Sequence, residues 1–351
     1  MTTNPIFIVG PSRSGTSMMR DLVAGHADVW IGGETHYFDD LRVRMHGHES
    51  ATMSPAQQKT CEDYFLALAD RPYGRGGDPE RAVKLTRDEL RAAAGRIGPG
   101  ADAHFVAYSE VMAGKQGKPR WGEKTPRHVF RIDDILGVWG DAKVICMVRV
   151  PRAVVSSYRW WKRDANRQQA RPVKDEAWTA DDVRAAKSYN VFVISMLWRA
   201  ATQATLRARE RHGPERVRIQ RYEDLIRDPE PELRQLTEWL GLEYDQSLLD
   251  VAVSNSSFIV PGDRGISMEP LDRWSTNLPP NEISVLQSCC GSLMRAVGYT
   301  PVETSASALS VAGTWATVPV ALGRALLVNR HRLGNPVDYV IRRTRLAAGR
   351  G

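Results

Sequence analysis

Short apolar runs alternate with longer amphipathic stretches along most of this chain of 351 residues. The clearest runs, at 5–10 and 143–149, are apolar almost throughout, which is typical of parallel strands buried on both faces of a sheet. Residues 216–225 instead alternate Val217 and Ile219 with charged side chains, so we expect this strand nearer an edge. Strands that alternate with helices predict an α/β fold with a central parallel sheet.

The stretches between these runs carry the signals of helices. We expect helices over 16–24, 79–95, 101–113, 126–138, 151–162, 182–211, 230–240 and 281–296. Gly25 and Gly241 are positioned to end two of them, because glycine commonly follows the last helical residue. Pro151 suits the first turn of another, where a missing N–H costs no hydrogen bond.

The composition changes after about residue 302. Residues 304–323 carry no charge, but Ser, Thr, Gly and Pro319 dilute the apolar side chains, so a membrane-spanning helix is not the favoured interpretation. We therefore divide the chain into a globular domain at 1–302 and a basic helical extension at 303–351. The simplest interpretation of the extension is a peripheral helix folded back on the domain. The alternative is an interfacial helix in contact with anionic lipid.

The charge distribution argues against a nucleic-acid partner. The net charge is +7, but residues 321–351 hold seven arginines against one acid, Asp338, so the rest of the chain is nearly neutral. A domain that binds nucleic acid would be expected to show a basic face on its folded body.

The cysteines and the first ten residues indicate in which cellular compartment we expect the protein. The four cysteines, at 61, 146, 289 and 290, form neither a metal-ligand spacing nor a disulfide framework, which favours a reduced, cytoplasmic protein. The first ten residues lack the basic start of a secretory signal, so we expect none before the first strand.

Residues 6–17, IFIVGPSRSGTS, pass from an apolar strand through a glycine-containing loop into a predicted helix. Such a loop directs backbone N–H groups and the positive end of the helix dipole at one point, which makes an anion site whatever the side chains. Thr16 stands where triphosphate-binding loops have lysine, and Arg13 is the nearest cation within the loop. The fold class that we predict is therefore a P-loop-type three-layer α/β/α architecture around the central parallel sheet.

A second cationic residue ends the strand predicted at 143–149. Magnesium-dependent nucleotide enzymes need an acid at the end of a later strand, whereas this strand ends in Arg149. Arg13 and Arg149 would both lie at the carboxyl ends of parallel strands, where open α/β sheets bind ligands. Together they predict a nucleotide with two separate phosphates, held without a metal ion.

These motifs resemble those of sulfotransferases that use 3'-phosphoadenosine 5'-phosphosulfate (PAPS), closest in pattern to bacterial members and to the protein-tyrosine sulfotransferase branch. GPSRSGTS at 10–17 is similar to the family's 5'-phosphosulfate loop, and VRVPRAVVSSY at 148–158 is similar to its 3'-phosphate motif. The resemblance covers about residues 4–300. It assigns nucleotide binding to Arg13, Ser14, Gly15, Thr16, Ser17, Arg149 and Ser157.

Other segments carry residues to which the resemblance gives a role. WIGGETHYF maps the catalytic glutamate to Glu34, and WGEKTPRH maps the catalytic lysine to Lys124. RYEDLIRDPEPELRQLTEWLGL maps a tyrosine near the nucleotide to Tyr222, and Arg264 is a further candidate contact to the 3'-phosphate. His36 competes with Glu34, because residues two apart in an extended segment point the same way and many sulfotransferases of small molecules use histidine as the base.

The resemblance implies an enzyme that moves a sulfuryl group in line, without metal, from PAPS to a hydroxyl of an acceptor. A carbohydrate, a glycolipid or a natural product is the favoured acceptor. Glu34 would remove the hydroxyl proton, and Lys124 would stabilise the departing oxygen. Two alternatives stay open: a P-loop kinase of small molecules or nucleotides, and a non-catalytic nucleotide-binding module. Peripheral membrane contact through the extension stays open as well.

Overall fold

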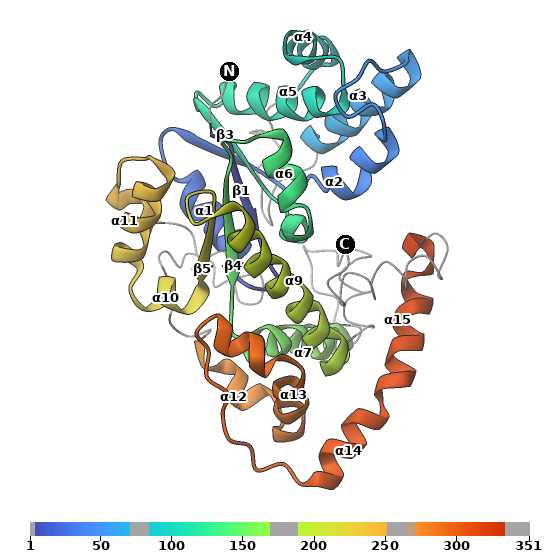
Figure 1. Cartoon of the computed structure of the whole chain (residues 1–351), viewed down its shortest axis with the longest axis vertical. Helices are drawn as coiled ribbons and strands as arrows, with labels where there is room; N and C mark the ends of the chain where they lie inside the picture. The colour runs from blue at the N-terminus through green and yellow to red at the C-terminus, as the bar shows by residue number, and fades with distance from the viewer. Residues whose placement is uncertain are drawn as a thin grey trace.

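A five-stranded parallel sheet forms the centre of the molecule (Figure 1). The structure is a computed structural model that describes residues 4–70, 84–168, 189–250, 266, 268 and 271–333. Within these residues the strand order is β2-β3-β1-β4-β5. The strands are β1 (Ile6–Val9), β2 (Val29–Gly32), β3 (Arg120–Lys124), β4 (Lys143–Val148) and β5 (Val217–Arg221).

Both faces of the sheet are buried, as the apolar runs predict. Side chains alternate along β1, so that Phe7 and Val9 join the apolar cluster on one face and Ile6 and Ile8 the cluster on the other. All four are fully buried. The three predicted strands are confirmed, and β5 is an edge strand as expected.

The pattern along the sequence does not predict β2 and β3. β2 has only four residues, and β3 carries Arg120, Glu123 and Lys124 among its five. The charged side chains hide β3 from a search for apolar runs, and β2 is apolar but short. Pairing with neighbours makes them strands: β3 lies between β1 and β2, with Gly32 of β2 opposite Glu123.

Fourteen α-helices and three short 3₁₀ helices connect and extend these strands in the described part of the chain. The α-helices are α1 (Thr16–Ala24), α2 (Tyr37–Asp40), α3 (Pro55–Ala69), α4 (Arg87–Ile97), α5 (Ala101–Gly114), α6 (Ile132–Val138), α7 (Pro151–Gln168), α9 (Val191–His212), α10 (Tyr222–Arg227), α11 (Pro229–Leu240), α12 (Arg273–Asn277), α13 (Pro280–Ala296), α14 (Ala308–Ala316) and α15 (Val318–Leu333). The 3₁₀ helices are η1 (Arg42–Met45), η3 (Pro126–Phe130) and η4 (Gln246–Leu249).

Most predicted helices agree with these bounds, but the one expected at 79–95 begins later. Its first residues, 79–83, lie outside the described residues, and the helix begins at Arg87. Thr86 sets this start, because its side chain accepts a hydrogen bond from the N–H of Glu89 while the Glu89 side chain bonds back to the N–H of Thr86.

Two other predicted helices also differ from the structure. The helix expected at 126–138 is two elements, η3 and α6, separated at Arg131, whose φ of −124° is not helical. Asn190 begins α9 as its N-cap, and residues 182–188 of that predicted helix lie outside the described residues.

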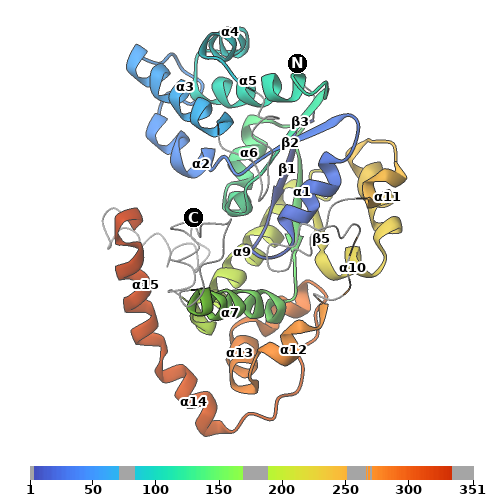
Figure 2. The ribbon, with the colours of Figure 1, turned by 180° about the vertical axis from the view of Figure 1, so that it is seen from behind.

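Helices lie on both sides of the sheet, as the three-layer prediction requires (Figures 1 and 2). α1, α10 and α11 pack on one face, and α5, α6 and α9 on the other, where α3 and α4 add to the layer. Phe105 of α5 is central to the second layer. Its ring centroid lies 6.4 Å from that of Phe7, 5.7 Å from that of Trp121 and 5.4 Å from that of Trp139. This aromatic packing anchors the strands that carry the site.

The C-terminal helices α14 and α15 run along one side of the molecule (Figures 1 and 2). Asn281 at the start of α13 donates a hydrogen bond to Thr314 Oγ1 at 2.7 Å, and Asn190 donates one to Thr317 Oγ1 at 3.2 Å. α15 exposes Val320, Leu322 and Leu327. No described helix combines the length and the hydropathy needed to cross a membrane. The domain boundary at residue 302 and any lipid contact stay predictions.

Candidate active site

The predicted site residues meet at the carboxyl edge of the sheet. β1 lies between β3 and β4, with Ile8 opposite Lys124 and Val9 opposite Cys146. Because parallel strands all end at the same edge, the loop after β1 begins beside the last residue of β3. Arg149, which follows β4 directly, joins the same edge. Residues far apart in the sequence are thereby brought together.

The loop between β1 and α1 follows a backbone path that is closely confined. Gly10 has φ 142°, and a Cβ there would lie 2.2 Å from the carbonyl oxygen of Met147. Gly15 has φ 89°, and a Cβ there would lie 2.5 Å from Cδ2 of Tyr222. Arg13 also has a positive φ, 71°, a conformation that costs a residue other than glycine about 1 to 3 kcal/mol. Packing against β4 and Tyr222 holds this strained loop in place.

The same loop has the features of an anion site. Thr16 and Ser17 begin α1, and the first N–H groups of a helix have no partner within it. Ser14 is fully buried, and its hydroxyl has no hydrogen-bond partner among the described residues. Since buried hydroxyls normally have partners, this one fits a ligand that brings an acceptor oxygen. The loop therefore fits the phosphosulfate end of the predicted donor.

A second group of predicted residues lies beside the loop. Arg13 Nε donates a hydrogen bond to Ser157 Oγ at 2.9 Å, and Arg149 donates one to the Arg13 carbonyl oxygen at 3.4 Å. The Arg149 guanidinium lies 4.2 Å from the ring centroid of Tyr222, within the range of a cation–π interaction. α7 begins at Pro151, so Ser157 lies on its second turn, facing back to the loop. Two arginines and a serine thus stand together where a second phosphate is expected.

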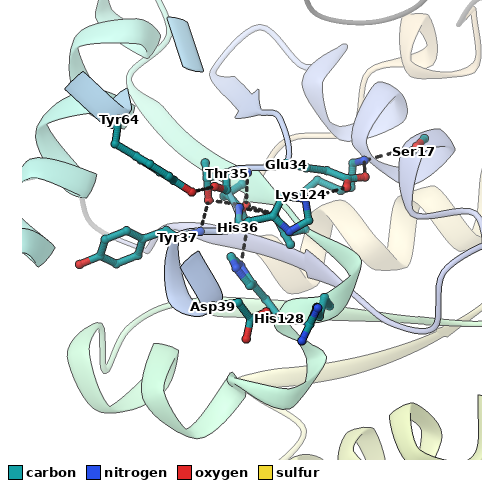
Figure 3. A network of polar contacts seen from close by, with 12 residues as sticks. Ser17, Glu34, Thr35, His36, Tyr37, Asp39, Tyr64, Lys124 and His128 are labelled. Carbon is teal, nitrogen blue, oxygen red and sulfur yellow. Dashed lines mark hydrogen bonds and ion pairs between the residues drawn. The ribbon is translucent and has the colours of Figure 1, made fainter. Parts of the chain in front are cut away.

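Glu34 and Lys124 form an ion pair beside the start of α1 (Figure 3). Lys124 Nζ donates to Glu34 Oε1 at 2.5 Å and to Ser17 Oγ at 3.4 Å. His36 Nε2 lies 3.5 Å from Glu34 Oε2, so the carboxylate lies between an ammonium group and an imidazole. The Lys124 side chain is 4% exposed and that of Glu34 41%. The carboxylate is therefore the member of the pair that an acceptor in solution can reach.

The neighbours of Glu34 determine its charge and that of His36. Burial alone raises the pKa of Glu34, but hydrogen bonds and positive charge from His36 and Lys124 outweigh it and lower the pKa to about 2. The hydrogen bond to Glu34 raises the pKa of His36 above its usual value, although burial opposes this. Glu34 is consequently a carboxylate at neutral pH, held by two donors.

The sequence interpretation missed the buried polar groups behind this ion pair. Glu123, next to Lys124, is 1% exposed and accepts hydrogen bonds from the N–H and the hydroxyl of Thr35 at 3.2 and 2.9 Å. The available signal was an acid inside the segment WGEKTPRH, because buried acids are rare unless they are paired. Arg264, the further candidate for the 3'-phosphate, lies outside the described residues.

Comparisons with known proteins indicate the family of this chain. The profile of a family described as "Sulfotransferase family" matches residues 5–246. The chain is 24% identical over 314 residues to Protein-tyrosine sulfotransferase A of Caenorhabditis elegans, which covers 85% of this chain and 68% of that protein. A putative protein-tyrosine sulfotransferase of Caenorhabditis briggsae is 24% identical over 248 residues, 70% of this chain and 68% of that protein.

Two solved structures share the fold. The sulfotransferase domain from the curacin biosynthetic pathway has a TM-score of 0.53 at 18% identity, covering 86% of this chain and 99% of that one. The sulfotransferase domain from the Synechococcus PCC 7002 olefin synthase has a TM-score of 0.50 at 20% identity, covering 85% of this chain and 96% of that one. The predicted α/β fold class is confirmed.

The contact between Glu34 and His36 leads to a prediction about titration. Glu34→Gln removes the charge and the ionic hydrogen bond that raise the pKa of His36, so this pKa should fall. An NMR titration of the histidine ring carbons measures the change. His46, whose side chain is 93% exposed and contacts Glu49 instead, is the internal control and should not respond to the substitution. A His36 pKa that stays the same would show that the two side chains do not interact in solution.

Proposed function

The chain belongs to the sulfotransferase family, and we propose that it transfers a sulfuryl group from PAPS to the hydroxyl of an acceptor. One observation carries this proposal: the Glu34–Lys124 ion pair meets Ser17 at the start of α1. That point also adjoins the loop to which Arg149 donates a hydrogen bond. An anion-binding helix start, an acid–base pair and a second phosphate-binding arginine are the groups that this transfer requires.

The donor would be bound at both of its charged ends. The N–H groups of the loop, with the hydroxyls of Ser14 and Ser17, would hold the 5'-phosphosulfate. Arg149 and Ser157 would hold the 3'-phosphate, where a guanidinium can bond two oxygens at once. Arg13 would serve both ends, because its backbone belongs to the loop and its side chain contacts Ser157. When bound, PAPS supplies the activated sulfuryl group.

The ion pair would carry the chemistry. Glu34 would accept the proton of the acceptor hydroxyl as its oxygen forms a bond to sulfur and the bond from sulfur to the bridging phosphate oxygen breaks. Lys124 would stabilise the negative charge that develops on the bridging oxygen. The pKa of Glu34, about 2 in its present contacts, would rise when Lys124 turns to that oxygen. The carboxylate would then become a better base at the moment of transfer.

An apolar cavity beside the loop gives information about the kind of acceptor that the protein could bind. It has a volume of about 170 Å³ and adjoins the loop at Pro11 and Ser12. Its apolar walls include Val129, Phe130, Val154, Ile194, Leu197 and Trp198. Tyr158 also lines it, and burial raises the pKa of this phenol.

This cavity supports an acceptor whose hydroxyl is carried by a molecule with an apolar part. Among the acceptors favoured by the sequence, a glycolipid or a natural product meets this requirement better than a bare carbohydrate. A tyrosine side chain, the acceptor in the name of the Caenorhabditis relatives, meets it as well.

Ligand stabilisation and product analysis together test the proposed function. Adenosine 3',5'-bisphosphate should raise the melting temperature of the protein, because it fills both phosphate sites. Mass spectrometry should then detect transfer of a sulfuryl group from PAPS to hydroxyl acceptors in the presence of a metal chelator. Stabilisation by ATP with magnesium but not by the bisphosphate would favour a kinase. Stabilisation by the bisphosphate without transfer to any acceptor of the panel would favour a binding module.

The choice of base is tested by substitution. Glu34→Gln should lower kcat by about 10² to 10⁴, the usual contribution of a general base, and leave the Kd of the bisphosphate nearly unchanged. His36→Ala is the matched variant and should have a smaller effect on kcat. Full activity in Glu34→Gln together with lost activity in His36→Ala would assign the base to His36 instead.

Filling the cavity should affect acceptor binding alone. Leu197 lines the cavity and is 40% exposed, so Leu197→Trp can enlarge the side chain without overpacking the core. The KM for an acceptor with an apolar part should rise, while the Kd of the bisphosphate stays the same. Ile97→Trp, at a position 39% exposed on α4, is the control. An unchanged KM in the Leu197 variant would remove the cavity from the acceptor site.

A further inference from the structure

Two buried carboxylates adjoin the site: Glu123 lies next to the Glu34–Lys124 pair, and Glu223 lies next to Arg149. Glu123 is the fourth residue of β3 and is 1% exposed. Glu223 follows the end of β5 and is 5% exposed. Each reaches across to the main chain beyond a neighbouring strand: Glu123 to Thr35 after β2, and Glu223 to Val150 after β4. Acids are rarely buried so deeply without a structural or functional reason.

We propose that both are positioning residues with separate tasks. Glu123 holds the Glu34–Lys124 pair in the geometry for transfer, and Glu223 holds Arg149 in the geometry for binding the 3'-phosphate. The inference rests on the proposed function, and it adds two residues to which neither the resemblance nor the family match gives a role.

Glu123 binds the segment that carries the proposed base. Its Oε1 accepts hydrogen bonds from the N–H of Thr35 at 3.2 Å, from the Thr35 hydroxyl at 2.9 Å and from the Thr125 hydroxyl. Its Oε2 lies 3.2 Å from Nδ1 of the fully buried His128. Thr35 is the residue between Glu34 and His36, so three donors from two loops converge on one oxygen directly behind the ion pair.

The segment around Thr35 depends on these bonds, because its backbone is unusual. His36 has a φ of 52°, in the left-handed region, and its N–H donates to Thr125 Oγ1 at 3.4 Å. The Thr35 hydroxyl accepts from the N–H of Tyr37 at 3.2 Å, and the Thr35 carbonyl accepts from Tyr64. A non-glycine residue stays in such a conformation only where its surroundings hold it there. Glu123 supplies the charge at the centre of that network.

Glu123 also links the base to the lysine. Side chains alternate along a strand, so Glu123 and Lys124 project to opposite sides of β3. Glu123 thus accepts a hydrogen bond from Thr35, the residue after Glu34, while Lys124 on the other side of the strand bonds the Glu34 carboxylate itself. Although burial raises the pKa of Glu123, the charge of His128 and the surrounding hydrogen bonds lower it overall, so the group stays ionised.

Glu223, on the other side of β1, bonds the main chain next to Arg149, as Glu123 bonds the main chain next to Glu34. Its Oε1 accepts from the N–H of Val150 at 3.0 Å, and its Oε2 accepts from the hydroxyl of Tyr299 at 2.6 Å. The carbonyl of Arg149 accepts from Nε1 of Trp198 at 2.9 Å. The peptide that joins Arg149 to Val150 is therefore bonded at both its carbonyl and its N–H. The Arg149 guanidinium then lies against Tyr222, the residue before Glu223.

Two alanine variants separate the two tasks. In Glu123→Ala, kcat at saturating donor and acceptor should fall about 10- to 100-fold, since a displacement of about 1 Å in a reacting group can cost 10²-fold. The Kd of adenosine 3',5'-bisphosphate, measured by calorimetry, should change by less than about threefold. In Glu223→Ala this Kd should rise about tenfold or more, as for loss of a hydrogen bond to a charged group, with kcat at saturation nearly kept.

Milder variants guard against loss of the fold. Thr35→Val removes the hydroxyl that bonds Glu123, and Tyr299→Phe removes the hydroxyl that bonds Glu223. Thr35→Val should lower kcat, and Tyr299→Phe should raise the Kd of the bisphosphate, each by less than the matching alanine variant. Glu62→Ala is the control for loss of a buried acid: Glu62 is fully buried, and its partners Gln58, Arg87 and Arg91 lie on α3 and α4 rather than in the loops of the site. It should lower the melting temperature without changing kcat or the bisphosphate Kd.

The outcomes distinguish this inference from the proposed function. Opposite effects on kcat and Kd in the two variants support two separate positioning residues. The inference is overturned if both variants lose kcat and bisphosphate affinity to the same extent. It is also overturned if their changes are no larger than those of Glu62→Ala. Either result would show that the two acids serve only stability. A wild-type protein that neither binds the bisphosphate nor transfers a sulfuryl group would overturn the proposed function itself, and this inference with it.

Discussion

The parallel register of β1 between β3 and β4 is the constraint on which the rest of the site depends. Because Ile8 pairs with both Lys124 and Ile145, the loop that follows β1 emerges between the ends of its two neighbours. One neighbour brings Lys124 to the start of α1, and the other brings Arg149 to the back of the loop. A shift of one residue in either pairing would turn these side chains to the opposite face of the sheet.

This arrangement places charged side chains in a buried region, where the loss of hydration is unfavourable. Each of them is compensated there by an ion pair or by hydrogen bonds. Lys124 is almost buried, and its partner Glu34 and the hydroxyl of Ser17 compensate the loss of water. Behind the pair, Glu123 is ionised only because hydroxyl, backbone and imidazole donors surround it. Neutral replacements of similar shape would often be as stable, so the presence of such groups points to function rather than to stability.

The sequence predicted the local features of the site well and the long-range ones poorly. Gly15, Arg13 and Arg149 lie in motifs whose geometry follows from neighbouring residues: a strand, a tight loop and a helix start. β3 was missed because its charged residues interrupt the apolar pattern, although the resemblance identified Lys124 within it. Glu123 gave only the signal of an acid inside WGEKTPRH, because its partner Thr35 comes from a distant loop that only the folded sheet brings to it.

In the proposed function, the position of Lys124 accounts for the threonine at position 16, where triphosphate-binding loops have lysine. A lysine inside the loop can reach only the phosphates that the loop itself holds. Lys124 instead comes from the neighbouring strand and already contacts Glu34, the proposed base. In the proposed reaction, a single movement of its ammonium group would both uncover this carboxylate and supply charge to the departing oxygen. Coupling acid to base in this way requires that the cation stand between the loop and Glu34. The end of β3 meets that condition, because it pairs with β1 on one side and with β2 on the other.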